Sequence, residues 1–130
     1  MGKSKIKLAE TYFNKEDGLS QVTLSTPFGH FTGSAICNYA DGDEFSELVG
    51  GSFAEMRAWI KYYKTLALIT RQSLKELNGI YCCSKPNKTR DMIKQRMDEL
   101  QEIWEVCNRE ISLINKEIDA RNEYLGKKDK

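Results

Sequence analysis

Proline, histidine and long apolar runs are the scarce features of this sequence. Its 130 residues include two prolines and a single histidine, His30. Two of the four cysteines, Cys82 and Cys83, are adjacent, a spacing that suits neither a CxxC motif nor a zinc site. We therefore expect four free thiols and no metal site.

No apolar stretch approaches the roughly 20 residues that a transmembrane helix needs. The basic start, Met1–Lys5, leads into no signal-peptide core. Hydrophobic residues make up 40% of the chain and the net charge is +1, values typical of a globular protein. We expect a single cytoplasmic domain, residues 1–130, with one modest core and no membrane partner.

Motifs of catalysis and phosphate loops are missing as well. The chain has no Walker sequence and no GxGxxG, and no serine or cysteine nucleophile motif accompanies His30. The acidic run Asp41–Glu44 lacks the ligand spacing of an EF-hand loop and is interpreted as a solvated loop. Gly50–Ser52 is expected at a helix N-terminus, which favours anions, although Ser52 as a cap explains it alone. We expect no enzyme and no cofactor.

The first third of the chain has the pattern of a sheet. Residues 6–13 are rich in strand formers, residues 21–25 alternate apolar and polar, and residues 30–38 place small and apolar residues on one face. We predict a three-stranded antiparallel meander within residues 1–45, one face of which must be covered.

The stretch TPFGHFTG joins the second and third of these strands. Pro27 and Gly29 predict a hairpin turn with Phe28 at its tip. Gly33 is interpreted as a strand glycine that leaves room for a neighbouring helix.

The remaining sequence has the periodicity of two long helices. A capping box, Ser52–Glu55, predicts a first helix over residues 52–78, closed by the Asn78-Gly79 pair. A second is predicted over residues 89–122, with a frayed tail at 126–130. Apolar residues recur at spacings of three and four, as in a coiled coil: Phe53, Met56, Ile60, Tyr63, Ala67, Thr70, Leu74 and Leu77, then Ile93, Met97, Leu100, Trp104, Cys107, Ile111, Ile114 and Ile118.

The short linker makes the two helices antiparallel neighbours. The predicted fold is therefore α+β: a three-stranded antiparallel meander followed by a long, coiled-coil-like helical hairpin. The first helix has a second apolar stripe, and such wide apolar faces on a small chain predict self-association; the stripe comprises Trp59, Tyr62, Leu66 and Ile69.

Charge is segregated between the helices. Five basic residues follow one side of the first helix, whereas the second is acidic by comparison. The stripe has two interpretations: it pairs with the second helix or is solvated, or it forms an anion site in which arginine forks bind phosphate oxygens. The net charge favours a small nucleotide over a nucleic-acid polymer as ligand. The stripe comprises Arg57, Lys61, Lys64, Arg71 and Lys75.

Three residues outside the stripe are further candidates for a ligand site. Asn108 and Arg109 lie away from the seam of the second helix, where an oligomer would place a shared pocket. Phe28 is an exposed aromatic residue that is suited to stacking on a base.

The stretches STPFGHFTGSAICN, GGSFAEMRAWIKYYK and EIWEVCNREI, taken with this organisation, resemble the first family of phage Thoeris anti-defence proteins. The resemblance covers nearly the whole chain. It implies a homo-oligomer, a dimer or a higher assembly such as a hexamer, in the bacterial cytoplasm during infection. It also implies that the protein sequesters cyclic ADP-ribose isomers made by TIR-domain enzymes, without degrading them, and some relatives hold other cyclic nucleotides.

The resemblance implies arginines on the phosphates, and Arg57 and Arg109 are the first candidates. Asn108 and Phe28 are candidates for the ribose and base, with Lys61 and Arg71 as supporting cations. Two other functions stay open: a helical hairpin that inhibits a host enzyme by direct contact, and a phage accessory protein that binds nucleic acid.

Overall fold

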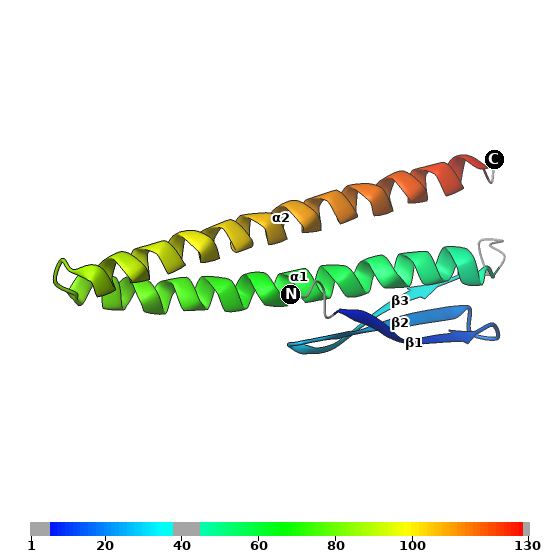
Figure 1. Cartoon of the computed structure of the whole chain (residues 1–130). Helices are drawn as coiled ribbons and strands as arrows, with labels where there is room; N and C mark the ends of the chain where they lie inside the picture. Colours follow the sequence, from blue (N-terminus) through cyan, green and yellow to red (C-terminus); the bar gives the residue numbers. More distant parts are fainter. Residues whose placement is uncertain (1–5, 38–44, 129–130) are drawn as a thin grey trace. The chain divides into compact units, whose positions relative to one another are not determined.

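The computed structural model describes residues 6–37 and 45–128 and confirms the α+β class. Figure 1 shows three strands followed by two long helices. The acidic run Asp41–Glu44 lies outside the described residues. The elements are β1 (Lys7–Asn14), β2 (Leu19–Thr26), β3 (Gly29–Ile36), α1 (Glu47–Cys83) and α2 (Lys88–Lys128).

The chain forms two compact units, and each helix contributes to both. The first, named the sheet unit, contains Met1–Tyr62 and Ile114–Lys130. The second, named the hairpin unit, is Tyr63–Leu113. Within the described residues, no helix is both long and apolar enough to span a bilayer.

The sheet is the predicted meander, ordered β1-β2-β3 with both pairs antiparallel. The β2–β3 register runs from Leu19 opposite Ile36 to Thr26 opposite Gly29. Between these strands the Thr26 hydroxyl accepts from the Phe28 N–H (3.1 Å) and donates to the Gly29 carbonyl (2.8 Å). Gly29 has a φ of 117°, which glycine adopts without strain, so the predicted hairpin turn is confirmed.

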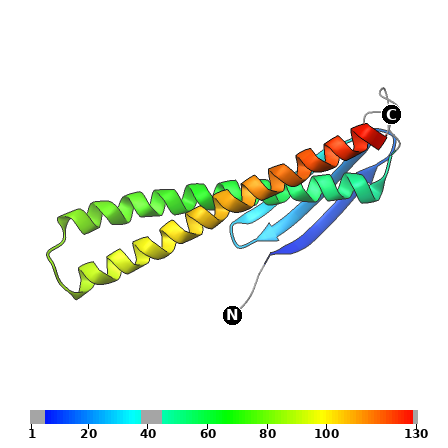
Figure 2. The same cartoon turned by 90° about the horizontal axis from the view of Figure 1, so that it is seen from above.

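One face of the sheet packs on the first turns of α1, as Figure 2 shows from above. Val22 and Leu24 of β2 are each 2% exposed. The predicted role of Gly33 is confirmed, because a Cβ there would collide with the Ala54 carbonyl and the Ala58 nitrogen. The core cluster of this unit contains Val22, Ala35, Phe53 and Ala54, with Met56 and Ile118 packed against it.

The predicted boundaries of the first helix are wrong at both ends. Ser46, and not Ser52, caps α1: its hydroxyl accepts from the Val49 N–H (3.2 Å) and its carbonyl from the Gly50 N–H (2.8 Å). Ser52 lies inside the helix and accepts a hydrogen bond from Arg121. Gly79 also lies within α1, which continues to Cys83.

The glycines near the start of α1 explain the first error. Gly50 and Gly51 lack the side chain that would separate the helix from the sheet. A Cβ at Gly50 would overlap the Ser20 side chain, and one at Gly51 would lie 3.4 Å from the Phe13 ring. These residues permit close packing, and Gly50–Ser52 lie inside α1 and not at the helix N-terminus where they were expected.

The second helix begins close to its predicted start and ends later than predicted. Asn87 caps it, since its Oδ1 accepts from the Arg90 N–H at 3.0 Å. The predicted frayed tail is wrong in part, because α2 continues to Lys128.

In the hairpin unit, Ala67, Thr70, Leu100 and Cys107 are buried. Cys107 is 1% exposed, and this burial raises its pKa. It therefore packs as a small apolar residue, as expected for a cysteine on the helical seam. Cys82 and Cys83 are exposed, and none of the four cysteines forms a disulfide within the described residues.

Candidate functional site

An open groove of about 390 Å³ lies between the two helices of the hairpin unit. Its volume is in the usual range for small-molecule sites, roughly 300–1,000 Å³. It is lined by Arg71, Leu74, Lys75 and Asn78 of α1 and by Met97 and Gln101 of α2.

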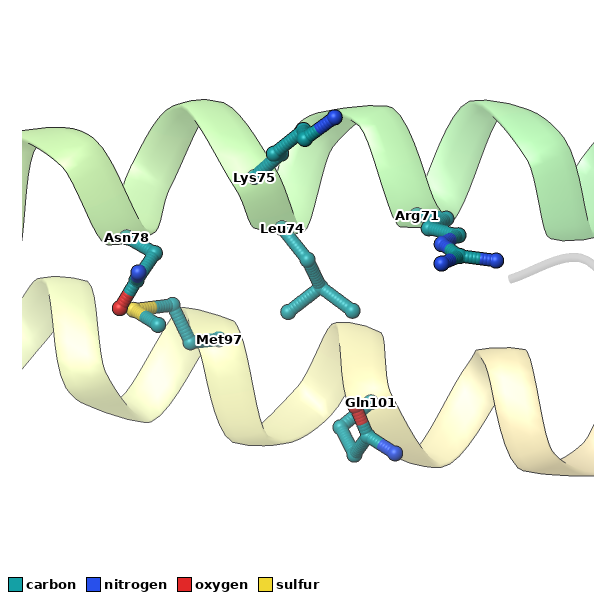
Figure 3. A pocket seen from close by; sticks show the side chains of 6 residues that line it. All are labelled: Arg71, Leu74, Lys75, Asn78, Met97 and Gln101. Carbon is teal, nitrogen blue, oxygen red and sulfur yellow. The ribbon is translucent and has the colours of Figure 1, made fainter.

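The lining combines apolar, cationic and amide side chains. Leu74 points from α1 towards α2, and Met97 lies beside Asn78, which gives the groove an apolar centre (Figure 3). The Arg71 guanidinium lies beside the gap between the helices, whereas the Lys75 ammonium points away from α2 (Figure 3).

The two cations of the groove, Arg71 and Lys75, form no ion pair in the part of the chain that the structure describes. The ion pairs among the described residues lie within α2: Lys94–Asp98, Arg96–Glu99 and Glu117–Arg121. None of them joins α1 to α2, so salt bridges between the helices do not account for the basic stripe within the described chain. Arg71 and Lys75 are exposed and available to an anion.

The amides of the groove supply donors and acceptors. The Gln101 Nε2 donates to a Glu105 carboxylate oxygen at 3.2 Å, which leaves its carbonyl oxygen as an acceptor. The Asn78 Oδ1 lies 3.9 Å from the Cys82 sulfur, a weak interaction that leaves the amide N–H groups as donors.

Other residues of α1 and α2 lie on the same side of the hairpin as the groove. At about 100° per residue, positions seven apart share a flank. Lys64 therefore lies on the same flank of α1 as Arg71, and Asn108 on the same flank of α2 as Gln101. Of the two candidates predicted side by side on α2, Asn108 faces the groove side, and Arg109 is turned by about 100° from it.

Arg57 and Lys61, the other part of the predicted stripe, contact the sheet. The Arg57 Nη1 donates to the Ser34 carbonyl at 2.7 Å, and the Lys61 Nζ donates to the Thr32 carbonyl at 2.6 Å. The Arg57 guanidinium also lies 5.9 Å from the centre of the Phe53 ring. These cations bind backbone oxygens of the edge strand β3.

Phe28 and His30 lie at the β2–β3 turn. Both are exposed, and Phe28 stands at the tip of the turn as predicted. Neither lines the groove. Of the predicted residues, Arg71 does so, together with Lys75 of the basic stripe.

Sequence reasoning missed four lining residues. Asn78 was assigned to the end of the helix, and Leu74 and Met97 were assigned to the packing seam. Gln101 had no distinguishing signal of its own. Its position one turn after Met97, opposite the basic stripe of an antiparallel helix, was the pattern that would have identified it.

Metal chemistry is not indicated by the described part of the chain, where no group of three or more histidine, cysteine or acidic side chains could hold an ion. Comparison with protein-family models, curated proteins and solved structures finds no match to this chain.

Proposed function

We propose that this protein binds a small, phosphate-containing nucleotide and holds it without chemical change. The observation that carries the proposal is the groove of the hairpin unit, where Arg71 and Lys75 form no ion pair with any acidic residue that the structure describes. The resemblance to Thoeris anti-defence proteins makes cyclic ADP-ribose isomers the first ligands to test, with cyclic di- and oligonucleotides next. In that role the phage protein blocks activation of a bacterial immune effector.

The lining suits the parts of such a ligand. A guanidinium fork binds phosphate oxygens in pairs, and the lysine adds a mobile positive charge. The amides of Asn78 and Gln101 provide hydrogen bonds for ribose hydroxyls or base edges. Leu74 and Met97 supply an apolar surface on which part of the base can lie.

The number of cations favours a compact ligand. Binding to a nucleic-acid backbone draws on many phosphate contacts and normally on a strongly basic face. The groove has two cations, and the chain as a whole has a net charge of +1. One or two phosphates match this arrangement better than a polymer does.

For a protein that sequesters a signal, binding alone is sufficient for function, and no catalytic step is needed. A protein that lowers the concentration of a signal by mass action needs affinity and abundance. Uniform binding of an intact ligand gives no rate enhancement. We further propose that the protein is a homo-oligomer, in which Arg109 and Asn108 approach ligands held between copies.

The direct test incubates the purified protein with individual cyclic ADP-ribose isomers, removes free ligand by filtration and heat-denatures the retained fraction. Recovery of unaltered ligand from that fraction is the expected result. Recovery of a modified ligand would identify an enzyme, and no retention of any cyclic nucleotide would contradict the proposal.

Substitutions locate the site. Arg71→Ala is expected to weaken retention at least about tenfold, because a hydrogen bond to a charged group contributes about 1.5–3 kcal/mol. Lys85→Ala, which removes an exposed cation outside the groove, is the matched control and should retain ligand normally. Arg57→Ala separates the two parts of the basic stripe: loss of retention there, with Arg71→Ala unaffected, would move the site to the sheet unit.

A further inference from the structure

A tryptophan of α2 lies next to the groove, beyond the residues that line it. Trp104 follows Met97 by seven residues, so the two side chains lie on the same flank of α2. In Figure 3, Gln101 lies on α2 between the levels of Leu74 and Arg71. Trp104 is three residues, about 4.5 Å, further along this antiparallel helix, which brings it close to the level of Arg71. The groove therefore has an aromatic side chain at the end where its guanidinium lies.

The α1 side of the same end is apolar as well. Leu68 precedes Lys75 of the groove by seven residues and shares its flank. Its side chain is 71% exposed, so it is not part of the packed core of the hairpin unit. Leu68 and Trp104 thus place apolar side chains on both helices beside the Arg71 end of the groove.

The Trp104 indole is partly exposed and makes no ring contact with any other residue that the structure describes. The aromatic pairs within residues 6–37 and 45–128 all lie in the sheet unit: Phe13–Phe45, Phe31–Tyr62 and Trp59–Tyr62. In the hairpin unit, Tyr81 has the Arg90 guanidinium over its ring, 4.2 Å from the ring centre. Trp104 has no such cation, so its ring surface is left for a ligand.

We propose that Trp104 is the platform on which the aromatic base of the bound nucleotide stacks, while Arg71 and Lys75 bind the phosphate oxygens. This inference rests on the proposed function and narrows the ligand class to phosphates that carry a base. Stacking on an aromatic side chain adds affinity without reading the edge of the base, because every base has a π face. Asn108, one turn beyond Trp104, supplies an amide for that edge.

Trp104 suits this role better than Phe28, the aromatic residue first expected to contact the base. Phe28 lies in the sheet unit and does not line the groove, whereas Trp104 and Arg71 belong to the same unit. The two fused rings of an indole overlap more of a purine than of a pyrimidine. Since base preferences at such platforms come from stacking strength, purine nucleotides are the expected ligands.

The first test observes the Trp104 indole directly. Trp59→Phe leaves Trp104 as the one tryptophan of the full chain. Titration of this variant with cyclic ADP-ribose isomers and with ADP should quench its fluorescence, in proportion to the nucleotide that is retained after filtration. Trp104→Phe is the matched control, because its remaining indole lies in the sheet unit and should not be quenched.

The second test separates the base from the phosphates. Trp104→Leu keeps an apolar side chain but removes the stacking surface, so it should weaken retention of the same nucleotides at least about fivefold. Its affinity for inorganic pyrophosphate, measured by calorimetry, should be unchanged. Arg71→Ala should weaken binding of both kinds of probe. Trp104→Tyr, which restores an aromatic ring, should recover most of the retention.

The outcomes distinguish this inference from the proposed function. Saturable retention without quenching of Trp104, equal quenching of Trp59, or full retention by Trp104→Leu would overturn the base platform and leave nucleotide binding intact. Equal losses of nucleotide and pyrophosphate in Trp104→Leu would show that the indole only supports the structure of the groove, which also overturns the platform. No retention of any nucleotide by the wild type would overturn both.

Discussion

The two units of the molecule use similar basic side chains for different purposes. In the sheet unit, Arg57 and Lys61 donate to carbonyls of β3, so their charges support the structure. In the hairpin unit, Arg71 and Lys75, from the same stripe of α1, form no ion pair within the described ranges 6–37 and 45–128. A charge stripe along one helix is therefore not a uniform surface, because the element that packs beside each part decides which of its cations have partners.

Packing differs between the units in the same way. The sheet unit has α1 so close to β3 that only glycine fits at position 33. The hairpin unit leaves apolar side chains exposed on one side and a groove on the other. The contact at Gly33 makes that part of the sheet unit the less tolerant of substitution, although both units leave large apolar side chains exposed.

The largest effect is expected from Gly33→Val. The new side chain would collide with backbone atoms of Ala54 and Ala58, which cannot move without displacing α1 from the sheet. We expect a loss of about 3 kcal/mol or more in the free energy of unfolding. Each unit contains one tryptophan, Trp59 in the sheet unit and Trp104 in the hairpin unit, so urea unfolding of single-tryptophan variants reports each unit separately.

The control for this substitution is Gly79→Ala, since a Cβ at Gly79 meets nothing within 4 Å. It should stabilise α1 by about 0.5–1 kcal/mol, because glycine is costly inside a helix. Equal losses from Gly33→Val at both tryptophans would show that the two units unfold together and do not differ in their tolerance of substitution.

Leu100→Ala is the corresponding test in the hairpin unit. Leu100 is buried there, and removing its side chain is expected to cost about 2–3 kcal/mol, reported mainly by Trp104. Leu68→Ala, at a position that is 71% exposed, should change stability by less than about 0.5 kcal/mol. A shift seen first at Trp59 would contradict the assignment of Leu100 to a separate core.

A smaller effect distinguishes the two arginines of the stripe. Arg57→Ala removes a hydrogen bond to Ser34 at the protein surface and the contact with the Phe53 ring, and should cost about 1 kcal/mol in chemical unfolding. Arg71→Ala removes no such bond and should be neutral within about 0.5 kcal/mol. Equal costs would mean that Arg71 also has a structural role.

The smallest expected effect on stability comes from the buried Cys107 thiol, which also differs in reactivity from the exposed thiols. Burial raises the pKa of Cys107 above its ordinary value of 9.0, so this thiol stays protonated in the folded chain. Its alkylation should be at least about tenfold slower than that of exposed Cys82 and Cys83, as measured by mass spectrometry of the labelled peptides.

The sign of the pH dependence follows from the same shift. The contribution of Cys107 to stability is complete below the unfolded pKa and is lost as pH rises through the folded one. Cys107→Ala should therefore flatten the loss of hairpin stability above pH 9.0. An unchanged slope would show that the thiol is not the group responsible.

The spacing of apolar residues was sufficient to predict the order of the elements. Three runs of alternating apolar and polar residues, followed by two heptad patterns, are compatible with few other folds. The same spacing did not predict the start of α1, because Gly50 and Gly51 are residue types that usually interrupt a helix. Their conformation is decided by contacts with Ser20 and Phe13, thirty or more residues away. Ser46 was missed as a cap for the same reason, since the glycines after it hid the start of the helix.

The candidate site was predictable in part. Arg71 could be found from the charge stripe, but nothing in the local sequence separated it from Arg57, because only the packed sheet shows which arginine has carbonyl acceptors nearby. Asn78 and Met97 were hidden by their assignments to a helix end and to a packing seam. Gln101 is brought to them by the pairing of the two helices, which is a tertiary property.

The contacts of Arg57 and Lys61 with β3 also limit how the sheet can grow. A three-stranded sheet has two edges, and here the outward carbonyls of Thr32 and Ser34 on one edge are already occupied. These two bonds make the β3 edge a poorer template for another strand than an edge whose carbonyls have no side-chain donors.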